Sequence, residues 1–194
     1  LEFNFIYVLA SMEQKGIKID VKLLKEYKDR SLIYLNELTQ NIYEACGESF
    51  NINSPKQLGV ILFEKLELAS SKKTKTGYST DESVLESLKN EHKVVPLLLK
   101  YREAFKLHST YIEPLLELGL KDSENRVFSS FLHTGTTTGR LSSKNPNLQN
   151  IPVGAFSDIQ IRRAFIAQEG YKLVGVDYSQ IELRLLAHFS KDEA

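Results

Sequence analysis

One long amphipathic stretch constrains the fold of this chain more than any other feature. Between Asp20 and Gly47, apolar and small side chains recur every three or four residues, at Leu24, Tyr27, Ser31, Leu35, Leu38, Ile42 and Ala45. Aspartate is a favoured N-cap, and glycine often ends helices because it adopts the left-handed backbone without strain. The spacing therefore predicts a single long helix that buries one stripe and projects from a domain.

Shorter helices are expected on either side, at about residues 5–16, 54–66, 79–90 and 96–114. Ser54, Pro55 and Gln57 combine a capping serine, a proline at the first helical position and a glutamine three residues after the cap. This combination marks a helix start. Pro114 is expected to end the helix that Pro96 opens, because proline lacks the N–H that a helix interior requires.

After residue 125 the pattern changes to short runs of β-branched and aromatic residues, at 126–132, 161–166 and 173–177. Glycine and asparagine turns separate these runs, which is typical of strands. A final stretch with helical spacing runs from Ile181 to Phe189. We therefore expect an α+β fold with a domain boundary near residues 112–125.

Composition excludes several classes of protein. The 194 residues are 42% apolar and 26% charged, which is enough to bury one or two modest cores. Lys plus Arg and Asp plus Glu each number 25, so any contact with DNA must come from local basic patches. The single cysteine, Cys46, excludes an internal disulfide framework and fits a reducing cytoplasm, where we expect a buried thiol. No stretch has the length of a membrane helix or the pattern of an export leader.

An apolar run, Leu173 to Val176, leads directly into Asp177. A buried strand that ends in a carboxylate would hold that charge at a sheet edge, where Mg²⁺ could bind it together with substrate phosphates. Spacing alone leaves alternatives open. Asp177 and Glu182 could both be ligands in a two-metal nuclease, or Asp177 could cap the following helix while Glu182 complements the helix dipole.

The residues from Asp177 to Arg184 read DYSQIELR, which resembles the first metal-binding motif of the family A DNA polymerases, the bacterial DNA polymerase I group. Residues 136–143 and 145–152 are similar to the TxTGRLSS and PNLQNIP patterns of that family, and 101–111 to its YRxxxKLxSTY pattern. The resemblance covers essentially the whole chain. A phosphate-loop interpretation of 135–140 fails, because its spacing is one residue short and its lysine is absent.

The resemblance implies specific roles around the motif. Asp177 and the Tyr178 carbonyl would bind the catalytic magnesium ions, and Asp177, Glu182 and Arg140 would be the catalytic residues. Nucleotide binding would involve Ser179, Gln180, Ile181 and Glu182. Glu182 would fill the volume beside C2′ and so exclude a ribose hydroxyl. Arg140 would contact the minor-groove acceptors that all base pairs share.

The resemblance also implies primer–template DNA and deoxynucleoside triphosphates as partners, in a cytoplasmic, nucleoid-associated bacterial protein. The expected DNA-binding residues are polar or basic: Asn53, Ser54, Lys73, Arg102, Lys106, Thr110, Thr138, Arg140, Asn147, Gln149, Asn150 and Gln180. In isolation, Arg102 and Lys106 would more often belong to a solvated helix face. Lys73 lies in a basic loop, 72–76, which the resemblance places at the tip of the helical thumb subdomain.

Three segments follow from the resemblance: a connector helix at 1–20, a helical thumb at 21–120 and the N-terminal part of an antiparallel-sheet palm at 121–194. A fingers helix and a His-Asp-Glu hairpin, which the family requires, do not occur. Lys191-Asp192-Glu193 does not replace the hairpin, and Asp122-Ser123-Glu124 reads as a turn. We expect a fragment that binds DNA weakly, lacks activity and self-associates through an exposed sheet edge. Two alternatives are a non-catalytic duplex-binding module and a two-metal nuclease.

Overall fold

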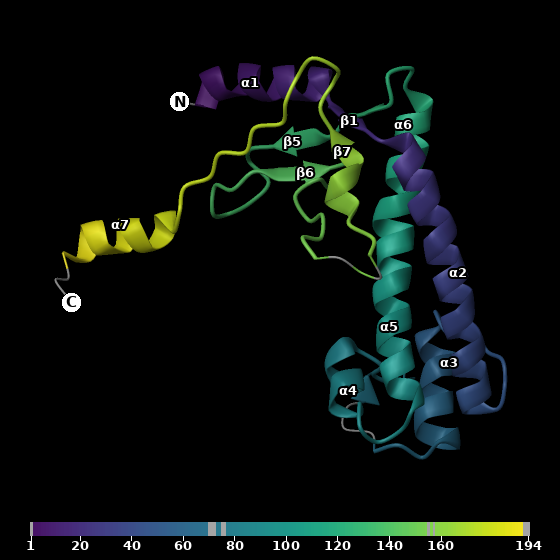
Figure 1. Ribbon diagram of the computed structural model, residues 1–194. Coiled ribbons are helices and arrows are strands. Elements are labelled where there is room, and N and C mark those ends of the chain that lie inside the picture. The colour runs from purple at the N-terminus through teal and green to yellow at the C-terminus, as the bar shows by residue number, and fades with distance from the viewer. Residues whose placement is uncertain (1, 70–72, 75–76, 155, 157, 192–194) are drawn as a thin grey trace.

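The computed structural model describes residues 2–69, 73–74, 77–154, 156 and 158–191. Two helical rods run side by side along most of its length (Figure 1). One rod is α2 (Val21–Cys46), and the other consists of α5 (Val94–Lys106), η2 (Leu107–Ile112) and α6 (Glu113–Lys121). A small, mainly helical tip lies at one end of the rods, and most of the strands lie at the other end together with α1 (Glu2–Lys15).

The predicted long helix is confirmed, and so are the two residues that were predicted to begin and end it. Asp20 Oδ1 accepts a hydrogen bond from the Leu23 backbone N–H at 2.9 Å, which caps the helix. Gly47 adopts the left-handed conformation at φ 75°, and its N–H donates to the Tyr43 carbonyl. The expected stripe is buried from Leu24 to Ile42, where it faces the second rod.

The tip contains α3 (Pro55–Val60), the π-helical turn η1 (Ile61–Lys65), the strands β2 (Lys73–Thr74) and β3 (Gly77–Tyr78), and α4 (Glu82–Ser87). Ser54 caps α3 as predicted, since its Oγ accepts from the Gln57 N–H at 3.4 Å. The predicted start at Ser79 or Thr80 is one or two residues early, because Asp81 is the N-cap of α4. Cys46 packs half-buried against the core of the tip, and burial raises the pKa of its thiol.

The predicted end at Pro114 is wrong, because the helical rod continues through it to Lys121. Pro114 sits in the first turn of α6, directly after the π-helical segment η2. In an α-helix the proline ring would clash with the carbonyl four residues earlier, and a wider π-turn shifts that carbonyl. The wider turn therefore lets the rod accommodate a residue that would otherwise end it.

A buried histidine lies in this π-segment. His108 Nδ1 is 2.8 Å from Ser31 Oγ on α2, and His108 Nε2 is 4.0 Å from Glu113 Oε2. Burial lowers the pKa of His108, Glu113 raises it and Lys28 lowers it. The neutral imidazole is therefore favoured, and it joins the two rods by a hydrogen bond, as expected for a histidine with a packing role.

The main sheet is antiparallel and brings together strands from distant parts of the sequence. β1 (Ile17–Ile19) is its central strand, flanked by β4 (Arg126–Val127) and β7 (Phe165–Ile166). A second, two-stranded sheet pairs β5 (Ser130–Leu132) with β6 (Ser142–Lys144), and the 3-10 helix η3 (Ile161–Ala164) precedes β7. Long helices and small antiparallel sheets confirm the predicted α+β class. No helix among the described residues is long and apolar enough to cross a bilayer.

The predicted strand at 173–177 is wrong. Residues 171–178 form neither helix nor strand, and Val176 is 93% exposed. A strand needs a neighbour that pairs with its backbone groups, and none of the described strands pairs with this run. The following helix, α7 (Ile181–Ser190), is present as predicted but buries none of its residues and lies apart from the other helices in Figure 1.

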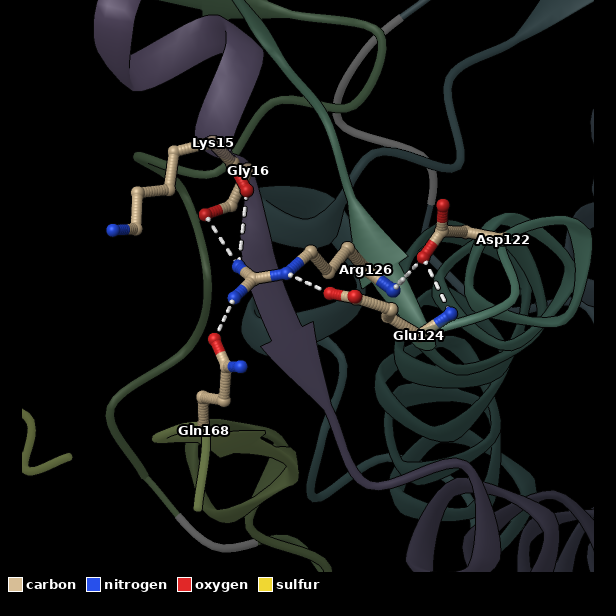
Figure 2. A network of polar contacts seen from close by, with 6 residues as sticks. All are labelled: Lys15, Gly16, Asp122, Glu124, Arg126 and Gln168. Atoms are coloured by element: carbon tan, nitrogen blue, oxygen red, sulfur yellow. Dashed lines mark hydrogen bonds and ion pairs between the residues drawn. The ribbon is translucent and has the colours of Figure 1, made fainter. Parts of the chain in front are cut away.

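Arg126 fastens the sheet to the end of α1 (Figure 2). Its Nη1 donates to the carbonyls of Lys15 at 3.0 Å and Gly16 at 3.3 Å, and its Nη2 donates to Gln168 Oε1 at 2.8 Å. Its Nε donates to Glu124 Oε2 at 3.1 Å. One guanidinium therefore joins the chain start, the turn before β4 and the segment after β7.

The preceding turn supports the same strand. Asp122 Oδ2 accepts hydrogen bonds from the backbone N–H groups of Glu124 and Arg126, each at 3.0 Å. Asp122-Ser123-Glu124 therefore forms the polar turn that its sequence predicts.

Replacing Arg126 with alanine should lower the free energy of unfolding by about 2–3 kcal/mol, because charge-assisted hydrogen bonds are lost and carbonyls are left unpaired. Urea unfolding followed by circular dichroism measures this change. The control is Glu124→Ala, which removes only a carboxylate that is mostly exposed and should cost less than about 1 kcal/mol. Equal losses in the two variants would contradict the conclusion that Arg126 stabilises the fold by joining these three segments.

Candidate nucleic-acid interface

Arg140 lies in an exposed loop between β5 and β6. Gly139 turns the loop with a left-handed φ of 73°, and nothing lies within 4 Å of the position that a Cβ would take there. Thr136 Oγ1 donates to the Arg140 carbonyl at 2.7 Å, and Thr138 Oγ1 is 3.5 Å from Thr136 Oγ1. The threonines of the motif therefore shape the loop, and the Arg140 side chain extends from it.

The structure brings two of the predicted catalytic residues together. Arg140 Nη2 donates to Glu182 Oε1 at 3.2 Å, across 42 residues of sequence. Both side chains are 77% exposed. An ion pair in this setting contributes little stability, so either group can exchange its partner for a ligand without a large penalty.

Residues 177–180 form an exposed approach to α7. Asp177 and Tyr178 lie in the irregular segment, and Ser179 and Gln180 form the turn that follows. Gln180 is the N-cap of α7 with a left-handed φ of 51°, and no side chain caps the helix. The alternative in which Asp177 caps this helix is therefore wrong, and its carboxylate has no capping role. Ile181, the first residue of α7, is exposed as well.

The donor set for a cation here consists of the Asp177 carboxylate and the Tyr178 carbonyl. Both are hard oxygen donors of the kind that Mg²⁺ prefers. Among the described residues, no group of three or more His, Cys, Asp or Glu side chains could hold a metal ion. The residues fit magnesium in kind, but this segment alone supplies only part of a coordination shell.

Asn147 and Gln149 hold their own loop in shape. Asn147 Oδ1 accepts from Ser143 Oγ at 3.1 Å and from the Gln149 N–H at 3.0 Å. Gln149 Nε2 donates to the Leu141 carbonyl at 2.9 Å. These amides thus have structural partners, which the sequence analysis did not identify.

Two further residues, not identified from sequence, fix the end of this segment. Tyr111 of η2 donates its hydroxyl to the Asn150 carbonyl at 2.7 Å. Arg162 donates to the carbonyls of Ile151 at 3.1 Å and Pro152 at 3.2 Å. Tyr111 and Lys106 both belong to the YRxxxKLxSTY pattern at residues 101–111, and this pattern is the sequence signal that could have identified Tyr111. Arg162 stands in a run without a recognisable motif.

A groove of about 340 Å³ lies between the rod and this segment. Its lining includes Lys106 of α5 and Asn150, together with Glu103, Tyr111 and Pro152. The structure therefore places two predicted DNA-binding residues on one concave surface. Thr110 is exposed on the next turn of the rod, and Thr138 is exposed in the Arg140 loop.

Arg102 is engaged within the protein. Its Nη2 donates to Thr80 Oγ1 at 3.1 Å and its Nη1 donates to the Thr80 carbonyl, so it ties α5 to the segment before α4. Burial lowers the pKa of Arg102, although nearby Asp81 and Glu82 act in the opposite direction. Lys106 is exposed one turn further on, and it is the more accessible cation of the pair.

The predicted residues at the tip also have local partners. Asn53 Nδ2 donates to the Tyr101 hydroxyl at 3.1 Å, and Ser54 caps α3. Lys73 lies in β2, and the other predicted basic positions of its loop, 72 and 75, lie outside the described residues. Residues 192 and 193 of the Lys191-Asp192-Glu193 sequence also lie outside the described residues.

Comparison with known proteins gives one consistent result. The model of DNA polymerase family A matches residues 21–194. DNA polymerase I of Bacillus subtilis strain 168 is 51% identical over 194 residues, which is all of this chain and 22% of that protein. DNA polymerase I of Caldicellulosiruptor bescii is 50% identical over 193 residues, or 23% of its length. The chain spans about a fifth of the length of these curated relatives.

A solved structure agrees with the sequence matches. The POL domain of Pol1 from M. smegmatis, in complex with DNA primer-template and dNTP, superposes with a TM-score of 0.84 at 40% identity. The match covers 95% of this chain and 33% of that one.

Changing Tyr111 to phenylalanine should lower the free energy of unfolding by about 1 kcal/mol, because the partly buried hydrogen bond to the Asn150 carbonyl is lost. Arg140→Ala is the control, and it should change stability by less than about 0.5 kcal/mol, since its ion pair is exposed. Chemical unfolding of both variants makes the comparison. A greater loss for Arg140→Ala would show that the pair is structural.

Proposed function

The chain belongs to DNA polymerase family A, and from this premise we propose that it supplies the duplex-binding helices and the first part of the active site of a template-directed DNA polymerase. The contact between Arg140 and Glu182 carries this proposal. It joins a side chain suited to the minor groove of the nascent base pair and one suited to the sugar of the incoming nucleotide. These two groups examine the same base pair only if they are neighbours.

The proposed reaction joins a deoxynucleotide to a primer. The primer 3′-hydroxyl attacks the α-phosphate of a deoxynucleoside triphosphate, and pyrophosphate leaves. Asp177 and the Tyr178 carbonyl would hold magnesium, which when bound neutralises phosphate charge and favours the deprotonated 3′-oxygen. Their exposure leaves room for substrate phosphates beside them.

Glu182 would select the sugar. A carboxylate side chain beside C2′ excludes a hydroxyl from that volume, so deoxyribose is preferred. Arg140, which lies within hydrogen-bonding distance of Glu182, would donate to purine N3 or pyrimidine O2. Those acceptors occupy similar positions in all base pairs, so the contact tests pairing geometry and not sequence. Ser179, Gln180 and Ile181 would line the nucleotide and primer end.

The helical rods would grip the duplex as a thumb at 21–120, after a connector at 1–20 and before the palm segment at 121–194. Lys106 and Asn150 line one groove. The POL domain of Pol1 from M. smegmatis, which superposes on this chain, is in complex with a primer-template. We assign phosphate or template contacts to these residues and to Asn53, Ser54, Lys73, Arg102, Thr110, Thr138, Asn147 and Gln149. Such contacts supply affinity without sequence preference.

We propose that the isolated chain binds DNA weakly and does not extend primers. Asp177 is the one carboxylate available for metal in its segment once Glu182 is assigned to the sugar, and one carboxylate cannot offset the repulsion of two divalent ions. The exposed apolar residues of 171–190 favour self-association. A cytoplasmic, nucleoid-associated location agrees with a DNA substrate and a free thiol. The family match favours nucleotidyl transfer over the nuclease and the non-catalytic binding module.

In a full-length polymerase that contains this chain, Asp177→Ala should reduce primer extension by at least about a thousandfold, because charge stabilisation at the reacting phosphate is lost. Gel-resolved extension in the presence of magnesium measures this. Glu169→Ala, which removes another exposed carboxylate, should retain activity. Near-normal extension by the Asp177 variant would exclude this residue from the mechanism. The isolated chain, which we propose does not extend primers, is the negative control.

Replacing Lys106 with alanine should flatten the salt dependence of duplex binding by about 0.9 in the slope of log K against log salt, as expected for one lost phosphate contact. Fluorescence anisotropy with a labelled primer–template over a salt series gives the slope. Lys25→Ala removes an exposed charge from the other rod and should leave it unchanged. An unaltered slope in the Lys106 variant would exclude this groove as the duplex-binding surface.

A further inference from the structure

A second concave surface lies where α1 meets β1, outside the candidate interface. This pocket of about 250 Å³ is lined by Lys15, Lys18, Arg126, Tyr171 and Lys172, among other residues. None of these residues has a role in the function proposed above. Four of the residues that line it, Lys15, Gly16, Arg126 and Gln168, are drawn in Figure 2.

The pocket concentrates positive charge in a chain whose formal net charge is zero. Arg126 has the Glu124 carboxylate as its partner. Within the described part of the chain, the ammonium groups of Lys15, Lys18 and Lys172 have no ion-pair partner. Three uncompensated cations that share a pocket attract an anion more strongly than the same charges spread over a surface.

The backbone at Lys15 and Lys18 is held by contacts that do not involve the two ammonium groups. Arg126 binds the backbone carbonyl of Lys15 and not its side chain, and in Figure 2 the Lys15 ammonium points away from that network. Lys18 belongs to the central strand β1, which pairs on both sides. The backbone positions of Lys15 and Lys18 are therefore fixed, while their ammonium groups form no ion pair among the described residues.

An aromatic ring completes the pocket. Tyr171 is 67% exposed, and the Lys15 ammonium lies 5.9 Å from its ring centroid. The apolar residues Ile17, Ile166 and Leu173 line the pocket beside it. Cations next to an exposed aromatic ring form the surface on which single-stranded nucleic acids bind, because phosphates contact the cations and bases stack on the ring.

We propose that this pocket binds one nucleotide unit, with its phosphate held by Lys15, Lys18 and Lys172 and its base against Tyr171. The volume admits a single unit and not a duplex. The unit belongs to a single strand or is a free nucleotide, and the two sources share this chemistry. Arg126 acts as a positioning residue, since its own donors bind protein groups.

The test uses the whole chain, a fluorescein-labelled oligothymidylate and anisotropy over a salt series. Replacing Lys15 and Lys172 together with alanine should lower the salt slope by about 1.4, at about 0.7 for each single-strand phosphate contact. Replacing Tyr171 with alanine should weaken binding by about fivefold or more, because base stacking is lost. Both variants retain the backbone groups that Arg126 binds, and circular dichroism checks that they are folded.

The matched control is Lys22→Ala with Lys25→Ala, which removes two exposed ammonium groups of α2 and should leave the slope unchanged. Thymidine monophosphate is the competitor: displacement of the strand at micromolar concentrations assigns the pocket to free nucleotides, and displacement only at far higher concentrations assigns it to strands. The proposal is overturned if the Lys15 and Lys172 variant binds the strand with an unchanged slope. It is also overturned if the α2 control loses as much slope, or if the Tyr171 variant binds as tightly as the parent.

This result does not depend on the proposed polymerase function. Single-strand binding at the pocket can be lost while the Lys106 groove still binds duplex, and primer extension can fail while the pocket still binds a strand. Single-strand binding that responds to Lys106→Ala but not to the lysines of the pocket would place the strand in the groove and exclude the pocket.

Discussion

The pairing of β1 with two strands from distant parts of the sequence is the constraint on which the rest of the molecule depends. Lys18 lies opposite Arg126 on one side and Ile166 on the other, so a three-residue strand fixes the chain start against both later segments. Its neighbour Ile19 is buried under α6, where Gly119 permits a close approach. A Cβ on Gly119 would lie 2.3 Å from Ile19 Cδ1. The second helical rod can therefore rest directly on the sheet, and the position of the groove beside Lys106 follows from that contact.

The π-helical segment transmits this position to the candidate interface. Between α5 and α6 it turns His108 toward Ser31 on the first rod and Tyr111 toward the Asn150 carbonyl. A regular α-helix through the same residues would change which side chains face each way, because the π-turn accommodates an extra residue. The rods and the 147–152 segment are thus joined by hydrogen bonds that depend on one local irregularity. Lys106 and Asn150 line one groove for this reason, although 44 positions, 150 minus 106, separate them in sequence.

Local signals predicted much of the fold, and long-range ones did not. Asp20, Gly47 and Ser54 act on backbone groups within four residues, so their roles can be read without knowledge of the neighbours. The strand expected at 173–177 fails because pairing requires a partner, which hydrophobicity alone does not provide. The roles of Arg126 and Arg162 could not be identified, because the carbonyls and the amide that these two side chains join are brought close only by the fold. The motifs predicted interface roles for Asn147, Gln149 and Arg102, but not that these residues bind protein groups in this structure.

The arrangement around Glu182 shows how exposed side chains of the candidate site are organised. Glu182 is in the first turn of α7, a helix that buries nothing, so packing cannot orient its carboxylate. Arg140 performs that orientation from a loop that Thr136 and Gly139 shape, and the pair remains exposed. In solvent such a contact is weak, but desolvation beside a bound base pair would strengthen each charged hydrogen bond. The same two side chains would then be fixed by the ligand that they examine. Under the proposed function, organisation of this site would follow substrate binding and would not require a rigid site beforehand, in keeping with the irregular, exposed segment that contains Asp177 and Tyr178.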